Sequence, residues 1–414
     1  MPWFRWASSS SEDRFADEVI ALVRDLLGRE ARRTGGFALR IEQPVNGPVT
    51  MNLRNIYAEA QELDGDARAQ RLRRAVLGML PGPRPADWST ARPRLLPAVR
   101  RASWANTAIA AGEPGVVPFG MPLAPFVKVL CAIDSEHAIT FATADDLLRW
   151  DVSDDEALRT ASANLGRLPC EMKFAASGPA VMITGPDGYA SSWLAAPATL
   201  ARIAANIENF PSPVIAVAIT RDLLYLFAGD NPEFAARILG EAFEHYQSAV
   251  RRLSPVPYLV TETGISPWAP SPGHPARPVA DKAARYLAAV EYDEQKTMLD
   301  ELLPKVGEDV HVAAYELMQE ADGSCWSWTG WAATVTNGLL PHADLVVIED
   351  MSPAGHFAVP WDDALRIAGS VLQEEAAYDP PRWRHRGGPA DGTLAALKTA
   401  AVPFPQAADP RTAR

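Results

Sequence analysis

The chain has 414 residues, with 39 basic and 51 acidic side chains and a formal net charge of −12. Its 48% hydrophobic and 22% charged residues are typical of globular proteins, which argues against a disulfide-stapled mini-protein, a histone-like basic protein and a disordered chain. At about 150 residues per domain, this length predicts two or three domains.

The cysteines and the N-terminal sequence indicate the cellular compartment of the protein. Cys131, Cys170 and Cys325 are an odd number without a CxxC pair, so neither a disulfide framework nor a zinc site is predicted. The first residues lack the apolar run of a signal peptide, and no stretch has the about 20 apolar residues that span a bilayer. We therefore expect a cytoplasmic protein without membrane insertion.

The first hundred residues have an excess of positive charge. Residues 1–101 contain 17 arginines against 12 acidic residues. Apolar residues from Phe15 to Leu27 recur at spacings of three and four, which predicts an amphipathic helix that Gly35-Gly36 ends. Residues 37–41 alternate as a strand, and residues 53–80 have the periodicity of one long helix. The proline-rich segment 81–97 is interpreted as a connector.

The middle of the chain mixes strands and helices. Helix starts are marked by the capping-box patterns Thr143–Asp146 and Ser153–Glu156. Helices are expected near residues 197–206 and 232–253. The β-type runs are 127–133, 138–141, 171–174, 180–184, 214–218, 223–228 and 258–261. Pairs of strands with short turns predict an α+β fold with mostly antiparallel sheets packed with helices.

A second proline-rich stretch, residues 265–278, precedes an acidic part of the chain. Residues 266–414 contain 12 basic and 21 acidic side chains. The patterns that follow predict a helix over 281–302, a hairpin of residues 310–319 and 325–331 around Asp322-Gly323, a strand over 345–349 and a helix from Pro360 to Leu372.

These observations predict two tandem domains. The expected division is a disordered N-terminus, an α+β domain, a Pro-rich linker, an acidic Trp-rich α+β domain and a disordered tail, covering residues 1–11, 12–264, 265–285, 286–400 and 401–414. Limited proteolysis between Ile265 and Pro278 would test the boundary.

Five stretches together resemble a known family. They are MNLRNIYAEAQ from Met51, FATADDLLRWDVSDDEAL from Phe141, ASANL from Ala161, DGYASSWLA from Asp187 and TRDLLYLFAGDN from Thr220. In this order and spacing, residues 52–264 resemble the YtpQ-like bacterial family, the domain of unknown function numbered 1444. The resemblance implies a cytosolic α+β protein, and it transfers no catalytic residue. The acidic module after Pro278 departs from the family pattern.

A run of arginines without lysine is one candidate binding surface. Guanidinium groups match phosphate and carboxylate bidentately, so Arg71, Arg74, Arg100 and Arg101 are candidate anion contacts. A solvated helix face is the simpler interpretation. The negative net charge disfavours tight nucleic-acid binding, which needs clustered cations. The run comprises Arg68, Arg71, Arg73, Arg74, Arg84, Arg92, Arg94, Arg100 and Arg101.

Catalytic and metal-binding candidates have simpler structural explanations. Ser191 and Ser192 with Asp222 and His245 suggest a triad, but no GxSxG elbow is present. Cys131 lies in an apolar run where a thiol behaves as a hydrophobe. The carboxylates at 145–156 fit two helix starts. The remaining groups, His137 with Cys170, and His311, His342, His356 and His385 with Asp344, Glu349 and Asp350, match no compact motif. No cofactor or metal is predicted.

Tryptophan is concentrated in the C-terminal module. Alternation places Trp326 and Trp328 on one hairpin face and Trp331 on the other. Core packing accounts for two or three of the five; the others form a candidate surface for a protein or small ligand. The five are Trp326, Trp328, Trp331, Trp361 and Trp383.

Three functions follow as hypotheses. The first is a non-catalytic interaction or adaptor protein that binds a protein or small ligand. The second is a hydrolase-type enzyme with an unrecognised active site. The third is a weak nucleic-acid binder that uses the Arg68–Arg101 segment.

Overall fold

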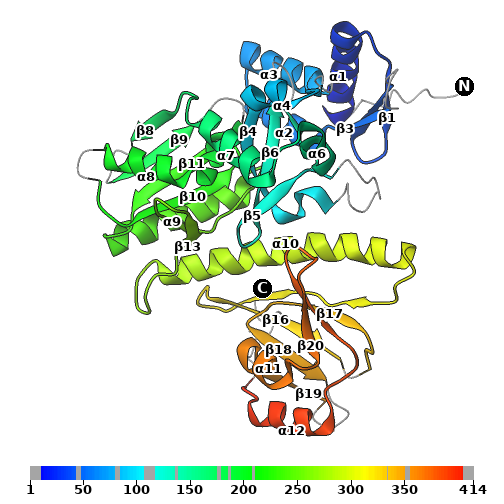
Figure 1. Ribbon diagram of the computed structural model, residues 1–414, viewed down its shortest axis with the longest axis vertical. Helices are drawn as coiled ribbons and strands as arrows, with labels where there is room; N and C mark the ends of the chain where they lie inside the picture. The colour runs from blue at the N-terminus through cyan, green and yellow to red at the C-terminus, as the bar shows by residue number, and fades with distance from the viewer. Residues whose placement is uncertain are drawn as a thin grey trace, which may run out of the picture.

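The computed structural model describes most of the chain. The described residues are 11–42, 48–79, 84–106, 117–135, 139–174, 179–184, 188–207, 210–332, 334–349 and 355–403. The protein is α+β, with several largely antiparallel sheets and helices packed on them (Figure 1). This fold class was predicted from the sequence. Most of the two ends predicted to be disordered, residues 1–11 and 401–414, lies outside the described residues. Ser11, however, begins a helix, and Val402 N donates to Ala358 O at 2.9 Å.

The N-terminal part is a small helix-and-sheet unit with its own core. Helix α1 (Ser11–Leu27) packs Phe15 and Val19 against Leu39 and Leu72. Its strands form one antiparallel sheet, β1 (Ala31–Thr34), β2 (Ala38–Ile41) and β3 (Val49–Asn52). Its other helices are α2 (Arg54–Gln61) and α3 (Gly65–Leu77).

Two local predictions in this part were wrong. Helix α1 ends before Gly28, which has a φ of +61°, whereas Gly36 occupies the turn between β1 and β2. The helix expected over residues 53–80 is two helices. Gly65, the first residue of α3, has a φ of +49°, so one continuous helix cannot pass through it from α2 into α3.

The second sheet has the order β4-β6-β5, and β7 pairs with β6. The connector predicted over residues 81–97 is too long, because its last three residues belong to the buried strand β4. Pro97 is tolerated there because β4 is an edge strand that, among the described strands, pairs only with β6. The predicted capping box of Thr143 and Asp146 is present, and Ser153 caps the next helix. The elements are α4 (Trp88–Ala91), η1 (Arg92–Arg94), β4 (Leu95–Arg101), η2 (Ala102–Ala105), β5 (Gly120–Ala124), β6 (Val127–Asp134), β7 (Ile139–Phe141), α6 (Ala144–Trp150) and α7 (Asp154–Leu165).

The third sheet has six strands in the order β13-β12-β10-β11-β9-β8, all antiparallel. Strand β10 is buried on both faces, which explains its continuous run of apolar residues. The elements are β8 (Glu171–Phe174), β9 (Ala180–Thr184), η4 (Ala190–Ala195), α8 (Pro197–Ala205), β10 (Val214–Thr220), β11 (Leu223–Ala228), α9 (Pro232–Ser248), β12 (Tyr258–Val260) and β13 (Ile265–Pro267).

The stretch predicted as a linker is packed on this sheet. Its first residues form β13, which adds a strand beside β12. Trp268 then contacts Phe227, with ring centroids 6.3 Å apart. The next helix, α10 (Arg277–Lys305), begins where the stretch ends. The division into two domains therefore stays a prediction.

Helix α10 lies between the parts that precede and follow it (Figure 1). Its Ala280 and Leu287 join the cores of the six-stranded sheet, while Met298 and Leu299 pack against strands of the C-terminal part. In the described residues no helix is long and apolar enough to cross a membrane.

The C-terminal part contains two four-stranded sheets, β14-β17-β21-β20 and β15-β16-β18-β19. The predicted hairpin around Asp322-Gly323 is present as β15 and β16, and β18 joins it in parallel. Its first strand is shorter than predicted, because residues 311–312 pair in the other sheet. The elements are β14 (His311–Val312), β15 (Glu316–Gln319), β16 (Cys325–Trp331), β17 (Gly338–Pro341), β18 (Leu345–Glu349), β19 (His356–Pro360), α11 (Trp361–Ala368), β20 (Leu372–Glu375), β21 (Arg382–His385) and α12 (Asp391–Thr399).

Candidate anion-binding site

A pocket of about 300 Å³ lies where the N-terminal unit, both central sheets and α10 meet. We call it the arginine pocket. Five of its lining residues are arginines and one is a glutamate. The lining residues are Asn55, Arg100, Arg101, Trp104, Arg221, Tyr246, Val250, Arg251, Arg252, Leu253, Val290 and Glu294.

Three of the five arginines come from the ends of buried strands, and the other two follow helix α9. Arg100 and Arg101 are the last two residues of β4, and Arg221 follows the last residue of β10. Beyond α9 the chain returns to β10, where Thr220 bridges Arg252 and Leu253 N donates to Ile219 O at 2.8 Å. The apolar residues of β4 and β10 thus hold these strands in the core, and the arginines at their ends line the same pocket.

Arg100 is a buried cation with incomplete hydrogen bonding. It is 4% exposed, its Nη1 donates to Val99 O at 2.8 Å, and its Cζ lies 5.6 Å from the Phe141 ring centroid. Its buried Nε has no acceptor in the part of the chain that the structure describes. Burial, together with the charges of Arg221 and Arg251, lowers the pKa of Arg100 to about 9.

Burial also lowers the pKa of two further arginines in the pocket, Arg221 and Arg251. Burial is the main cause that lowers the pKa of Arg221, and it lowers the pKa of Arg251 to about 10. Arg251 Nη2 donates to Glu59 Oε2 at 3.0 Å, and Arg71 Nε donates to the same oxygen at 2.6 Å. Among the described residues, the Arg221 side chain has neither a hydrogen bond nor an ion pair.

The positive charge of the pocket is therefore only partly balanced by direct ion pairs. Glu59 neutralises Arg251 and Arg71 only in part, and Glu294 is held by Arg101. Arg100 and Arg221 remain as two guanidinium groups that no described carboxylate contacts. Buried charges normally have partners. Asp222 acts on both guanidinium groups through its charge but forms no ion pair with either. Two neighbouring cations without a direct carboxylate partner provide the donors and the potential that bind a dianion.

Tyr246 adds a neutral hydrogen-bond donor. Its ring lies under Arg252, whose Cζ is 5.8 Å from the centroid, and its buried hydroxyl has no partner among the described residues. Burial raises the pKa of Tyr246 to about 12. The hydroxyl is thus protonated at neutral pH and can donate to an anion.

A buried carboxylate closes the α10 side of the pocket. Glu291 is fully buried; it accepts from Arg101 Nη1 at 2.9 Å and from Ser103 N at 2.7 Å. Glu294, one turn further along, accepts from Arg101 Nη2 at 2.8 Å. Burial raises the pKa of Glu291 to about 7, against the attraction of Arg101. These bonds tie α10 to the end of β4.

This carboxylate makes stability depend on pH. The pKa of Glu291 is higher in the folded protein than the ordinary 4.5, so the stability it contributes is complete below about pH 4.5 and is lost as the pH rises through about 7. As the pH rises from about 4.5 to about 7, the free energy of unfolding of the wild type should therefore fall by roughly 3 kcal/mol relative to that of Glu291→Gln. Urea titrations at several pH values measure the difference. Glu301→Gln, at an exposed position of α10, is the control, and parallel pH profiles of wild type and Glu291→Gln would contradict the prediction.

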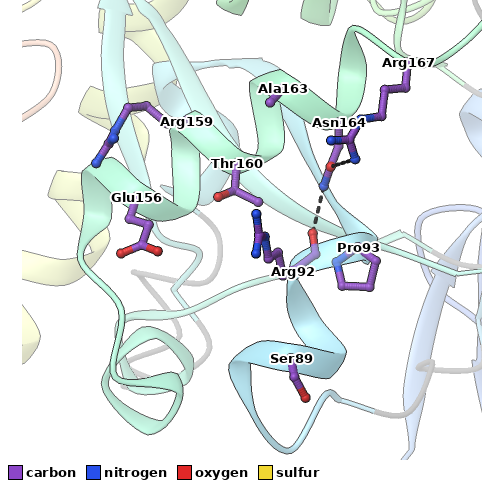
Figure 2. Close-up of a pocket in the computed structure, with 9 residues that line it drawn as sticks. All are labelled: Ser89, Arg92, Pro93, Glu156, Arg159, Thr160, Ala163, Asn164 and Arg167. Carbon is purple, nitrogen blue, oxygen red and sulfur yellow. Dashed lines mark hydrogen bonds between the residues drawn. The ribbon is translucent and has the colours of Figure 1, made fainter.

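A larger pocket, of about 670 Å³, lies beside α7 and η1 (Figure 2). Its Arg92, Arg159 and Arg167 are exposed to solvent. Asn164 Nδ2 donates to the Arg92 carbonyl at 2.7 Å, which holds the two elements together. Water solvates these exposed charges, so this pocket lacks the buried unpaired cations of the arginine pocket.

The predicted anion contacts are distributed unevenly. Arg100 and Arg101 line the arginine pocket, and Arg71 approaches it through Glu59. Arg74 lies on the exposed surface of α3. Arg221, Arg251 and Arg252 were not predicted as anion contacts, because they lie more than a hundred residues away along the chain.

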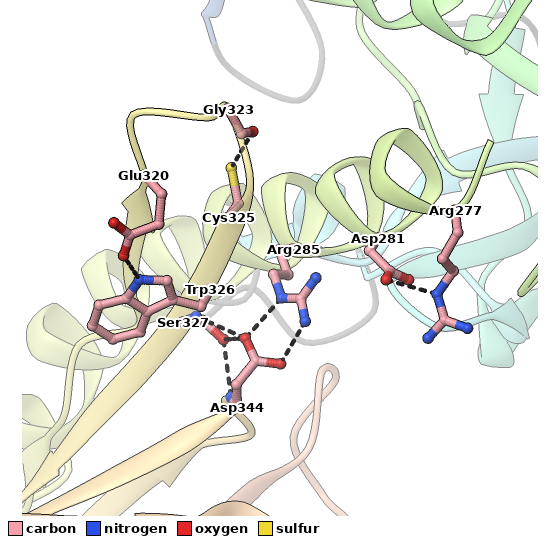
Figure 3. Close-up of polar contacts among 9 residues, drawn as sticks. All are labelled: Arg277, Asp281, Arg285, Glu320, Gly323, Cys325, Trp326, Ser327 and Asp344. Atoms are coloured by element: carbon pink, nitrogen blue, oxygen red, sulfur yellow. Dashed lines mark hydrogen bonds and ion pairs between the residues drawn. The ribbon is translucent and has the colours of Figure 1, made fainter. Parts of the chain in front are cut away.

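The five tryptophans of the predicted partner surface separate into two groups. Trp331, Trp361 and Trp383 are 0%, 3% and 9% exposed and pack in one core, so they do not form a surface. Trp326 and Trp328 are half-buried. Figure 3 shows Trp326 Nε1 donating to Glu320 Oε1 at 2.6 Å, near the Arg285–Asp344 ion pair.

The other catalytic candidates are not assembled. Ser191 and Ser192 are fully buried, whereas His245 is exposed on α9. Cys131 is buried, and burial raises the pKa of its thiol to about 12. Within the described ranges no group of three His, Cys, Asp or Glu residues could hold a metal ion. Asp187, His137 and Asp350 lie outside the described residues.

Comparisons with known proteins identify no relative. No family model matches the chain, and neither the curated proteins nor the solved structures yield a significant match. The geometry of the chain's own residues therefore has to support any functional proposal.

Proposed function

We propose that the protein binds a small molecule through a dianionic phosphate group held in the arginine pocket. This is the small-ligand form of the interaction-protein hypothesis. The observation that carries it is the pair of guanidinium groups, Arg100 and Arg221, that no described carboxylate contacts in a concave site. Two positive charges match a phosphate monoester, and a single carboxylate would neutralise only one of them.

The shape of the pocket favours a small ligand over a nucleic acid. At about 300 Å³ it is at the lower end of ligand-binding pockets. Its central cation, Arg100, is almost completely buried, whereas contacts to a nucleic-acid backbone use exposed arginines spread along a surface. One terminal phosphate group fits this geometry.

The pocket also supports binding more than catalysis. Its one lining carboxylate, Glu294, accepts hydrogen bonds from Arg101 and Ser103, so it is already engaged as a structural acceptor. Tyr246, whose pKa is raised, serves as a donor and not as a base.

We also propose that the chain is a cytoplasmic bacterial protein related to the YtpQ-like family. The support is the order of the five matching stretches in the sequence. Two of these stretches supply pocket residues, Asn55 from the first and Arg221 from the last.

Inorganic phosphate should stabilise the folded protein. A ligand at about 100 times its Kd adds about 2.7 kcal/mol to the free energy of unfolding. At about 2 °C per kcal/mol, the Tm should rise by about 5 °C. Differential scanning calorimetry with phosphate, against chloride at equal ionic strength, measures the shift.

Two matched variants test whether the arginine pocket causes the effect. Arg221→Gln should remove most of the phosphate-induced rise in Tm. Arg159→Gln, in the exposed pocket of Figure 2, should retain it. Equal Tm shifts in the two variants, or no shift in the wild type, would refute the proposed function.

A further inference from the structure

The arginine pocket has an aromatic wall beside its cations. Trp104 lines the pocket and is 43% exposed, which is unusual for a tryptophan outside an interface. Its ring meets Phe141 edge-on, with centroids 4.7 Å apart and an interplanar angle of 60°. Phe141 in turn packs under the Arg100 guanidinium at 5.6 Å. The buried cation, Phe141 and the exposed indole thus follow one another in direct contact.

Apolar side chains continue this wall. Val250, which is 38% exposed, lines the pocket together with Leu253 and Val290. A bare phosphate ion at Arg100 and Arg221 would leave the indole, Val250 and the exposed part of Val290 in contact with water. A ligand with an apolar, flat portion would cover them and gain both stacking and burial.

The volume limits what that portion can be. About 300 Å³ accommodates one phosphate group and one ring system, and leaves no room for a polymer. A half-exposed tryptophan favours planar rings, because stacking tolerates any ring that offers a π-face. Arg252, which is exposed at the pocket, can pack on the opposite side of such a ring.

We infer that the ligand is a phosphomonoester that carries an aromatic ring, with the phosphate at Arg100 and Arg221 and the ring on Trp104. This inference rests on the proposed function and names its ligand class. Two sources share the chemistry, a nucleoside monophosphate and a simple aryl phosphate.

Isothermal titration calorimetry on the full chain tests the inference with four probes at equal ionic strength. Inorganic phosphate and ribose 5-phosphate lack an aromatic ring, whereas phenyl phosphate and AMP have one. We expect at least one ring-bearing probe to bind about fivefold or more tighter than ribose 5-phosphate, which is the lower end of what stacking contributes. Tighter binding of AMP identifies the nucleotide class, and tighter binding of phenyl phosphate identifies the aryl phosphate class.

Three variants locate the ring. Trp104→Ala should abolish the preference for ring-bearing probes, so that it weakens their binding more than it weakens the binding of inorganic phosphate; retained phosphate binding shows that the pocket is folded. Trp104→Phe should restore the preference. Phe174→Ala, at a 63% exposed aromatic residue outside the pocket, should behave as the wild type.

The outcomes separate the two proposals. If ribose 5-phosphate binds as tightly as both ring-bearing probes, or if Trp104→Ala keeps the preference, the inference on the ring fails while phosphate binding stands. If no probe binds, both proposals fail.

Discussion

Replacing Arg100 with methionine is expected to weaken phosphate binding and, at the same time, to stabilise the protein without ligand. The loss of a buried charged donor costs about 2 kcal/mol or more of binding free energy. This corresponds to an affinity at least about thirtyfold lower. Calorimetric titration with phosphate measures the first effect, and urea titration in chloride buffer measures the second.

The gain in stability follows from the depressed pKa of this arginine. Its pKa in the folded protein is about 9, below the ordinary 12.5, so keeping it charged costs up to roughly 5 kcal/mol. This cost is fully present below about pH 9 and disappears only as the pH rises towards 12.5. Methionine fills a similar volume without charge but loses the contact with Phe141, so we expect a net gain of about 1 to 4 kcal/mol at pH 7.

The two effects together distinguish a binding residue from a structural one. Arg159→Met, at an exposed position of α7, controls for the loss of one positive charge and should change neither quantity. If Arg100→Met lowers stability and phosphate binding in parallel, Arg100 serves the fold and the assignment of the pocket is wrong.

Replacing Arg382 with methionine should lower the stability of the protein, in contrast to the same substitution at Arg100. Arg382 in β21 is fully buried, and burial lowers its pKa to about 10. Unlike Arg100, it has acceptors on every side. Its nitrogens donate to Gln295 Oε1 at 2.5 Å, Ala313 O at 2.8 Å, Tyr292 O at 3.0 Å and Leu339 O at 3.3 Å.

We expect Arg382→Met to lower the free energy of unfolding by about 3 to 5 kcal/mol, because it leaves several buried acceptors without a donor. Urea titration followed by far-UV circular dichroism measures the loss. Arg366→Met, at an exposed position of α11, is the matched control. A stability equal to that of the wild type would mean that the four acceptors find other donors, and that Arg382 does not attach α10 to the C-terminal sheet.

Local patterns predicted much of the fold. The apolar periodicity from Phe15 to Leu27, the capping box at Thr143 and the hairpin around Asp322-Gly323 each act within a few residues, and all three are present. The predicted bounds of helices were wrong where the backbone angle of a single glycine decides where a helix ends. The positive φ of Gly65 divides one predicted helix, and no periodicity of apolar residues reveals it.

The candidate site could be predicted only in part, because it is assembled by tertiary packing. Arg100 and Arg101 were singled out from a run of arginines, yet their partners Arg221 and Arg251 belong to other strands and loops. One signal was available for two of them: Arg100 and Arg221 each follow a run of apolar residues that forms a buried strand. A charged residue at the end of a buried strand is placed near the core, and its desolvation follows from that position.

Helix α10 has a consequence for how the protein folds as it is synthesised. Leu287 completes the core of the six-stranded sheet, and Glu291 supplies the buried acceptors for Arg101 and Ser103. Ribosomes add about 5 to 20 residues per second, so these groups are made about 1 to 3 s after the first 276 residues. During that interval the core of the sheet lacks Leu287, and Arg101 lacks its counter-charges. Nascent chains halted before α10 should therefore depend on chaperones more than chains that have passed it.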